Sequence, residues 1–156
     1  MPLIDHHPTE VVIVGGGVEG CSIAWHLAQS GAKVTLLERW QIAAAASGAS
    51  AGGVRHQGRD FREFPLAFRA IERWLTLEDE LAANVDYRRG GHATVTEHLD
   101  DLPVLAASVR AQQIAGLSIE VVQGDDLRTL IPGISPIVLA AAWSPNDGHA
   151  NPTATT

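Results

Sequence analysis

The feature that most constrains the fold is a short β-branched run followed at once by glycines. Residues 10–14 read Glu-Val-Val-Ile-Val, which predicts a strand buried on both faces, as in a parallel sheet. Apolar residues then recur at helical spacing over residues 18–30, and Gly31 follows where a helix C-cap is expected. Residues 33–38 predict a second strand. Strand, helix and strand in this order predict a right-handed βαβ crossover.

The glycines between the first strand and the helix have the spacing of a dinucleotide-binding turn. Gly15 permits the tight turn, Gly17 lets a pyrophosphate approach the backbone, and Gly20 allows the helix to pack closely on the strand. The free N–H groups and the helix dipole favour phosphate there, and Glu19 is interpreted as a solvated first-turn acid. A turn that binds no ligand is the alternative.

The second strand ends at Glu38, which is placed to accept hydrogen bonds from the ribose hydroxyls of an adenosine. Its negative charge would repel a 2′-phosphate, so the residue disfavours NADP and leaves FAD and NAD as the expected dinucleotides.

Composition excludes several classes of function. A formal charge of −7 without a basic run argues against nucleic acid as a partner. Cys21 is the only cysteine, which excludes an intrachain disulfide and a thiolate metal cluster and favours a reducing, cytoplasmic location. No signal peptide or membrane span is expected, and His6 and His7 are given no metal-binding role.

The remainder of the chain alternates loops with short elements. Residues 41–60 are rich in Ala, Gly and Ser and predict a long loop, either a flexible linker or a ligand-contacting segment. An aromatic stripe over residues 61–75 predicts a helix that faces the core. Residues 87–96 predict a strand or a hairpin around Gly90 and Gly91, and residues 100–115 a second amphipathic helix. A strand, a helical turn and another strand are predicted over residues 118–122, 125–130 and 137–143.

Two segments resemble the FAD-dependent amine oxidoreductases of the D-amino-acid oxidase superfamily, which includes glycine oxidase, sarcosine oxidase and D-amino acid dehydrogenase. The first runs from Val12 to Arg39, and the second, over residues 47–55, is similar to the family's second flavin-contacting loop. With His56 and Gln57 after it, the second segment is most similar to the flavin subunits of opine oxidase and hydrogen cyanide synthase. Residues 87–96 and 145–152 carry a weaker likeness.

The resemblance implies an α/β fold, with a Rossmann-like FAD-binding βαβ unit and the beginning of an α+β substrate domain. The implied domains are residues 1–80 for FAD binding, 81–144 for part of the substrate domain, and 145–156 for the return segment. Family members usually run more than twice this length. The chain is therefore expected to be the N-terminal portion of a longer protein, with doubtful activity by itself.

The resemblance also implies individual contacts, with FAD rather than a metal ion as the cofactor. The expected contacts are Gly15, Gly17, Val18, Glu19 and Gly20 at the pyrophosphate, Glu38 and Arg39 at the adenosine, and Ser47, Gly48, Ala51, Gly52 and Gly53 at the flavin. Non-covalent FAD is expected because Ala49 and Ala51 stand where a linking histidine would be sought, which leaves His56 as the exception. Arg55 matches a position that contacts the substrate carboxylate, a task that suits its planar fork, although a simple loop cation is the alternative.

By resemblance, the expected reaction is oxidation of the C–N bond of an amino acid or secondary amine to an imine. The expected partners are this small amine and, in a hetero-oligomer, a second protein chain. Two alternatives stay open. One is an NAD-dependent enzyme that shares only the βαβ unit, and the other is an inactive fragment or incomplete subunit.

Overall fold

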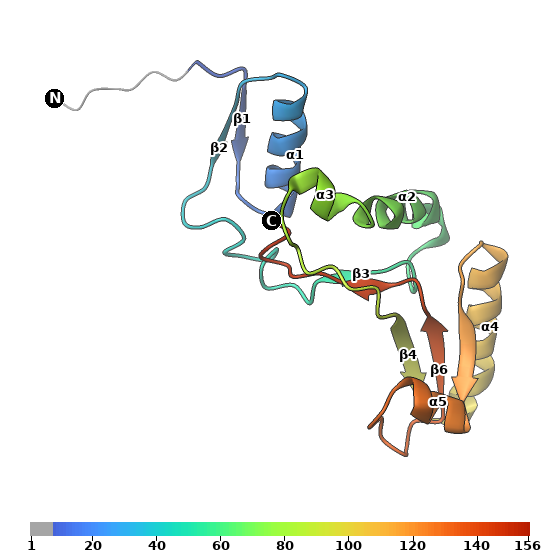
Figure 1. Ribbon diagram of the computed structural model, residues 1–156. Helices are drawn as coiled ribbons and strands as arrows, with labels where there is room; N and C mark the ends of the chain where they lie inside the picture. The colour runs from blue at the N-terminus through green and yellow to red at the C-terminus, as the bar shows by residue number, and fades with distance from the viewer. Residues whose placement is uncertain (1–7) are drawn as a thin grey trace. The chain divides into compact units, whose positions relative to one another are not determined.

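The computed structural model describes residues 8–156, so His6 and His7 lie outside the described residues (Figure 1). The chain divides into two compact units. The first ends at Gly52 and resumes with Asn151–Thr156, and the second is Gly53–Ala150. The domain boundaries after residues 80 and 144, which the resemblance implied, concern functional domains and remain a prediction.

The first unit contains the predicted βαβ crossover. Strand β1 (Val11–Val14) pairs in parallel with β2 (Val34–Leu37), and α1 (Val18–Gln29) connects them. The helix ends where expected, because Gly31 takes the left-handed conformation, with φ of +90°, and donates its N–H to Ala28 O at 3.0 Å. Each element has the predicted type, with ends that differ by one residue.

The expected burial of the first strand on both faces is wrong for this structure. Val12 is 53 % exposed and Val14 is 84 % exposed, whereas Val11 and Ile13 on the other face are partly buried. A parallel strand is buried on both faces only where layers cover both faces of its sheet. In the described part of this unit the sheet has two strands, and α1 is the one helix.

A three-stranded antiparallel sheet forms the framework of the second unit. Its order is β4 (His92–Thr96), β6 (Ala140–Ser144) and β5 (Glu120–Gln123), with β6 in the centre. The central strand carries Ala140, Ala141 and Ala142, all of which are buried. Such small side chains let the layers on the sheet approach closely.

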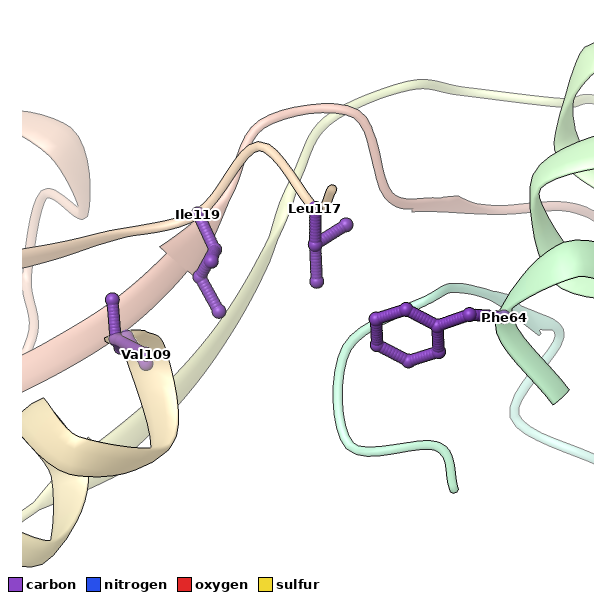
Figure 2. Packing of buried hydrophobic residues seen from close by; sticks show 5 residues of the cluster. Phe64, Val109, Leu117 and Ile119 are labelled. Atoms are coloured by element: carbon purple, nitrogen blue, oxygen red, sulfur yellow. The ribbon is translucent and has the colours of Figure 1, made fainter. Parts of the chain in front are cut away.

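The second unit has three buried hydrophobic clusters. The helical elements are η1 (Phe61–Glu63), α2 (Phe64–Trp74), α3 (Leu77–Leu81), η2 (Leu99–Asp101), α4 (Leu102–Ile114) and α5 (Gly124–Leu130). One cluster joins α2, α4 and the sheet through Phe64, Val109, Leu117, Ile119 and Ala142 (Figure 2). Another surrounds Leu127 of α5, which is fully buried, and includes Val122, Val138 and Ala141. The smallest contains Val54, Ile71 of α2 and Ala150. The predicted core stripe is confirmed for Phe64, Phe68 and Ile71, whereas Phe61 and Leu75 at its two ends are exposed.

Two short strands pair segments that are far apart in the sequence. Strand β3 (Gly53–Val54) lies antiparallel to β7 (Gly148–His149), with Gly53 opposite His149. Arg88 also forms a bridge with His149, so the chain before β4 joins this pair. Of the two expectations for residues 87–96, the strand is confirmed by β4, and the hairpin around Gly90 and Gly91 is wrong because Arg88 pairs with His149 of β7 instead of with β4.

Candidate functional site

The glycine turn of the first unit has the geometry of a phosphate-binding loop. Gly15 adopts φ of +111° and donates its N–H to Leu37 O at 2.8 Å, which ties the turn to β2. A Cβ atom on Gly20 would come within 2.1 Å of Gly15 O. Only glycine therefore lets the first turn of α1 pack against the end of β1 at this distance.

The start of α1 presents backbone donors that have no acceptor. Among the described residues the N–H groups of Gly17, Glu19 and Gly20 form no hydrogen bond, and the N-cap residue, Gly17, has no side chain that could accept one. These donors stand at the positive end of a 12-residue helix. The arrangement fits an anionic group such as a pyrophosphate, which would satisfy the donors and the dipole together.

Glu38 holds the turn as well as standing next to it. Its Oε2 accepts the N–H of Gly16 at 2.7 Å and its Oε1 accepts the N–H of Trp40 at 3.0 Å. The bond from Gly16, followed by the bond from Trp40, lowers the pKa of Glu38 below its ordinary value. The carboxylate is thus ionised at neutral pH, and each oxygen keeps a lone pair for a further donor. Its contact with a ribose remains a prediction.

The Ala- and Gly-rich loop packs against the glycine turn, which contradicts its interpretation as a flexible linker. Ser47 Oγ accepts the N–H of Val18 at 2.9 Å and lies 3.0 Å from where a Cβ of Gly17 would be. Ala43 donates its N–H to Gly16 O at 2.9 Å. A Cβ on Gly48 would come within 2.2 Å of Ala43 O, so this loop also requires glycine.

Two residues of this arrangement were missed by sequence reasoning. Gly16 joins the two neighbouring segments, with its N–H on Glu38 and its carbonyl on Ala43. Ala43 is buried and has φ of +62°, a strained conformation for an alanine. No periodicity or motif indicated either contact, although three consecutive glycines were a visible signal.

The other predicted cofactor residues are distributed over both units. Arg39 is exposed, and its guanidinium lies 4.5 Å from the ring centroid of Trp40. Ala51 and Gly52 end the first part of unit one, while Gly53 begins unit two. The structure thus brings together the turn, Glu38, Ser47 and Gly48, and leaves the roles of the others as predictions.

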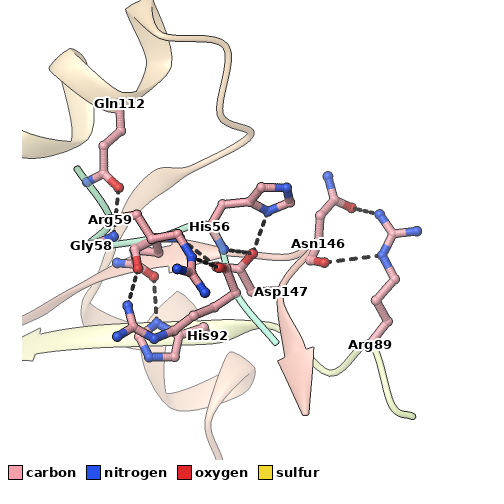
Figure 3. Close-up of polar contacts among 10 residues, drawn as sticks. His56, Gly58, Arg59, Arg89, His92, Gln112, Asn146 and Asp147 are labelled. Atoms are coloured by element: carbon pink, nitrogen blue, oxygen red, sulfur yellow. Dashed lines mark hydrogen bonds and ion pairs between the residues drawn. The ribbon is translucent and has the colours of Figure 1, made fainter. Parts of the chain in front are cut away.

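The second unit contains a buried carboxylate that holds a loop after β3. Asp147 is fully buried and accepts the N–H of His56 at 2.8 Å and the N–H of Gln57 at 3.0 Å (Figure 3). His56 Nδ1 lies 2.7 Å from Oδ1 of the same carboxylate. The centroid of the His56 ring lies 4.8 Å from that of the Phe68 ring. Three contacts to one side chain fix this segment. Sequence reasoning missed Asp147, although the likeness of residues 145–152 to the family's return segment was a signal.

Gln57 extends this network to β4 and β6. Its side-chain nitrogen donates to Ala142 O at 3.0 Å and to Thr94 Oγ1 at 3.1 Å, and its Oε1 lies 2.8 Å from His92 Nδ1. Burial and then the charge of Arg55 lower the pKa of His92, against an opposing effect of Asp147.

Arg55 is partly buried and has no carboxylate partner among residues 8–156. Its Nη1 donates to Gln57 O, and its own carbonyl accepts from Arg59 Nε at 2.8 Å. Within residues 8–156 neither its Nε nor its Nη2 forms a hydrogen bond, and the side chain joins no ion pair. This cation is therefore available to an external anion.

No group of three His, Cys, Asp or Glu side chains that could hold a metal ion occurs in the described part of the chain. None of the described helices has the length and apolar character that a membrane crossing requires.

Comparisons with known proteins place these features in a family context. The family model "FAD dependent oxidoreductase" matches residues 10–156. One subunit of the anaerobic glycerol-3-phosphate dehydrogenase of Escherichia coli K12 is 31% identical over 150 residues, which cover 95% of this chain and 27% of that protein. Glycine oxidase of Bacillus licheniformis is 30% identical, with 93% and 40% covered. One subunit of the opine oxidase of Rhizobium meliloti is 28% identical, with 93% and 42% covered.

A solved structure shows the same fold. Glycine oxidase from Bacillus cereus superposes with a TM-score of 0.84 and 29% identity, over 95% of this chain and 42% of that chain. The chain thus spans between about a quarter and two fifths of the length of these relatives.

We expect acid to weaken the first unit through Glu38. Because the folded pKa is lowered, the charged carboxylate contributes stability above the ordinary glutamate pKa of about 4.3, and this contribution is lost as the pH falls through the folded value. The difference in free energy of unfolding between wild type and Glu38→Gln should therefore shrink as the pH falls from about 6 to about 3. Urea unfolding at several pH values measures it. Glu72→Gln, at an exposed site on α2, is the control, and an equal pH trend in both variants would contradict the expectation.

We expect Asp147→Asn to destabilise the second unit by roughly 2–3 kcal/mol, because an amide NH₂ would replace one acceptor oxygen and face the N–H of His56 or Gln57. Urea unfolding measures the loss, and Asp100→Asn, at an exposed site in η2, is the matched control. Equal stability of the two variants would show that the buried carboxylate does not hold the loop.

Proposed function

The chain belongs to the FAD dependent oxidoreductase family, whose model matches residues 10–156, and from this premise we propose that the protein oxidises the C–N bond of an amino acid or secondary amine to an imine. FAD is the cofactor of the family, so the NAD-dependent alternative is set aside. The observation that carries the proposal is the glycine turn, whose remaining N–H donors are unpaired while Glu38 and Ser47 hydrogen-bond to it from either side. Glycine oxidase and opine oxidase among the relatives support an amine substrate.

The residues of the first unit fit the adenosine and pyrophosphate of FAD. The open N–H groups of Gly17, Glu19 and Gly20 would donate to the pyrophosphate, and the charged Glu38 would accept from the ribose diol. The proposed set of cofactor contacts is Gly15, Gly17, Val18, Glu19, Gly20, Glu38, Arg39, Ser47, Gly48, Ala51, Gly52 and Gly53. Bound without a covalent link, FAD supplies the acceptor for a hydride equivalent.

Arg55 is proposed to bind the carboxylate of the substrate. Its Nε and Nη2 are free among the described residues, and these two donors can meet both oxygens of one carboxylate. Asp147 holds the backbone that follows Arg55, so the side chain starts from a fixed segment. A fixed cation orients the substrate with little loss of conformational entropy on binding.

A second candidate is oxidation of an alcohol that carries a phosphate. It is favoured by the 31% identity with the relative from anaerobic glycerol-3-phosphate dehydrogenase. A guanidinium binds phosphate as well as carboxylate, so Arg55 is compatible with both substrates. The two candidates differ in the group that loses hydrogen, and a direct comparison of substrates separates them.

Partners and location are also part of the proposal. Two of the relatives are named as subunits of their enzymes, which supports a hetero-oligomer with a second chain. A cytoplasmic location is proposed from the single cysteine, Cys21, which is a free thiol. Burial, followed by the charge of Glu38, raises the pKa of this thiol, so it stays protonated and unreactive at neutral pH.

We expect Gly20→Ala to abolish flavin binding. The added Cβ would overlap the carbonyl of Gly15, so the turn or the helix must shift and the donors lose their alignment. Flavin absorbance of the purified protein after incubation with FAD and gel filtration measures the loss. Gly90→Ala is the control, because a Cβ there meets no atom within 4 Å and should leave the flavin in place. Full retention of flavin by Gly20→Ala would contradict the proposed site.

The reaction is tested on the complete gene product loaded with FAD. Mixed anaerobically with N-methylglycine, it should lose the absorbance of oxidised flavin, whereas glycerol 3-phosphate should leave the absorbance unchanged. Arg55→Ala should raise KM for the amine by on the order of 10- to 100-fold, since a charge-assisted bidentate contact is lost. Arg110→Ala, an exposed arginine on α4, is the control. Reduction by glycerol 3-phosphate alone would favour the second candidate, and reduction by neither would favour an inactive protein.

A further inference from the structure

The contacts of Gln57 determine which nitrogen of His92 carries a proton. The Gln57 atom that lies 3.0 Å from Ala142 O must be the amide nitrogen, because a backbone carbonyl can only accept. The amide oxygen is then the atom that lies 2.8 Å from His92 Nδ1. An amide oxygen can only accept, so Nδ1 of His92 must donate. This assignment follows from hydrogen-bond chemistry alone.

The second nitrogen of His92 is consequently an open acceptor. Burial and the charge of Arg55 lower the pKa of the ring, so it is neutral at neutral pH and carries its single proton on Nδ1. Nε2 therefore has a free lone pair, and no described residue donates a hydrogen bond to it. His92 is partly exposed, and its Nε2 is not among the fully buried side-chain atoms that lack a partner.

Two chemically different groups of the second unit thus contact the same residue, Gln57. Arg55 follows β3 and carries a permanent positive charge, while His92 begins β4 and offers a neutral acceptor. Gln57 links both, since its carbonyl accepts from Arg55 Nη1 and its side chain binds His92 Nδ1. Figure 3 shows His92 beside the segment that Asp147 holds. A ligand that fits this pair carries an anion and an N–H donor.

We propose that His92 Nε2 accepts the amine N–H of the substrate and takes one proton from its ammonium form, while Arg55 holds the carboxylate. This inference rests on the proposed function, because it places the amine relative to the carboxylate bound by Arg55. The charges balance: the ammonium becomes a neutral amine and the imidazole becomes an imidazolium. The nitrogen lone pair that is freed in this step is the one that stabilises the imine as hydride leaves the carbon.

The charges near His92 make this proton transfer depend on pH. Arg55 disfavours a second cation beside it, and Asp147 is the carboxylate that opposes this effect. Because the pKa of His92 is lowered, the acceptor is present at neutral pH and is lost on acidification, when Nε2 becomes protonated and can no longer accept. Recognition of the amine should therefore fail at acid pH while recognition of the carboxylate by Arg55 persists.

The test compares two ligands of nearly the same shape on the complete gene product. N-methylglycine has an amine where methoxyacetate has an ether oxygen, and both carry a carboxylate. His92→Asn is the matched variant, because its amide N–H can still donate to Gln57 Oε1 while Nε2 is removed. Calorimetry should show N-methylglycine binding about 10-fold more weakly to His92→Asn, with methoxyacetate binding unchanged. In the wild type the preference for the amine over the ether should decrease as the pH is lowered. In His92→Asn this preference should be independent of pH.

Nitrogen NMR of the imidazole gives a readout that does not depend on turnover. Long-range ¹H–¹⁵N spectra, assigned by the signals that His92→Asn removes, should show a proton on Nδ1 and a bare Nε2, and N-methylglycine should shift Nε2. A proton on Nε2 in the free protein would overturn the inference.

Arg55→Ala separates the proposed role of His92 from the proposed role of Arg55. If it weakens both ligands while His92→Asn weakens neither, the role of His92 falls and that of Arg55 stands. If Arg55→Ala changes neither ligand, the substrate site itself is wrong.

Discussion

The second unit depends on one buried carboxylate, that of Asp147. A buried polar group is tolerated when hydrogen-bond partners surround it, and here two backbone N–H groups donate to the carboxyl group and an imidazole nitrogen lies 2.7 Å from it. Those donors belong to a segment 90 residues earlier in the chain. By fixing the backbone of Gln57, Asp147 also fixes a side chain that reaches β4 and β6, and through it the tautomer of His92. The candidate substrate residues thus depend on a group that takes no part in the chemistry.

The glycine turn of the first unit depends on two backbone hydrogen bonds of Gly16. Its N–H binds Glu38 and its carbonyl binds Ala43, so one residue connects the end of β2 with the following loop. The next donor, the N–H of Val18, is taken by Ser47, which leaves the remaining donors of the helix start open. A turn that is held on both flanks by side chains, while the N–H groups of Gly17, Glu19 and Gly20 stay unpaired, is preorganised for an anion.

Local patterns predicted the elements well, and contacts between distant segments poorly. The βαβ crossover follows from periodicity and glycine spacing, both of which are local properties of about 30 residues. The failed hairpin illustrates the limit. Gly91 does adopt φ of +82°, but a Cβ there would lie 1.9 Å from Trp143, so this glycine serves packing against β6 and not a two-stranded turn. Likewise the contacts of Ser47 with Val18 and of Asp147 with His56 span 29 and 91 residues, and no repeat in the sequence encodes them. The prediction that both faces of β1 are buried was wrong. The apolar composition of a strand shows that it could be buried on both faces, but it does not show how many layers cover the sheet.

The pairing of β3 with β7 has a consequence for the way the second unit is connected. Gly53 and His149, which lie at the two ends of that unit, are opposite each other across one ladder. The two ends of the unit are therefore joined by backbone pairing, and Arg88 pairs with the other side of His149. Because this pairing closes the intervening 95 residues onto themselves, sequence changes between the two strands leave the spacing of the two ends untouched. Pairing of this kind lets the interior of the second unit diversify while its own two ends stay joined.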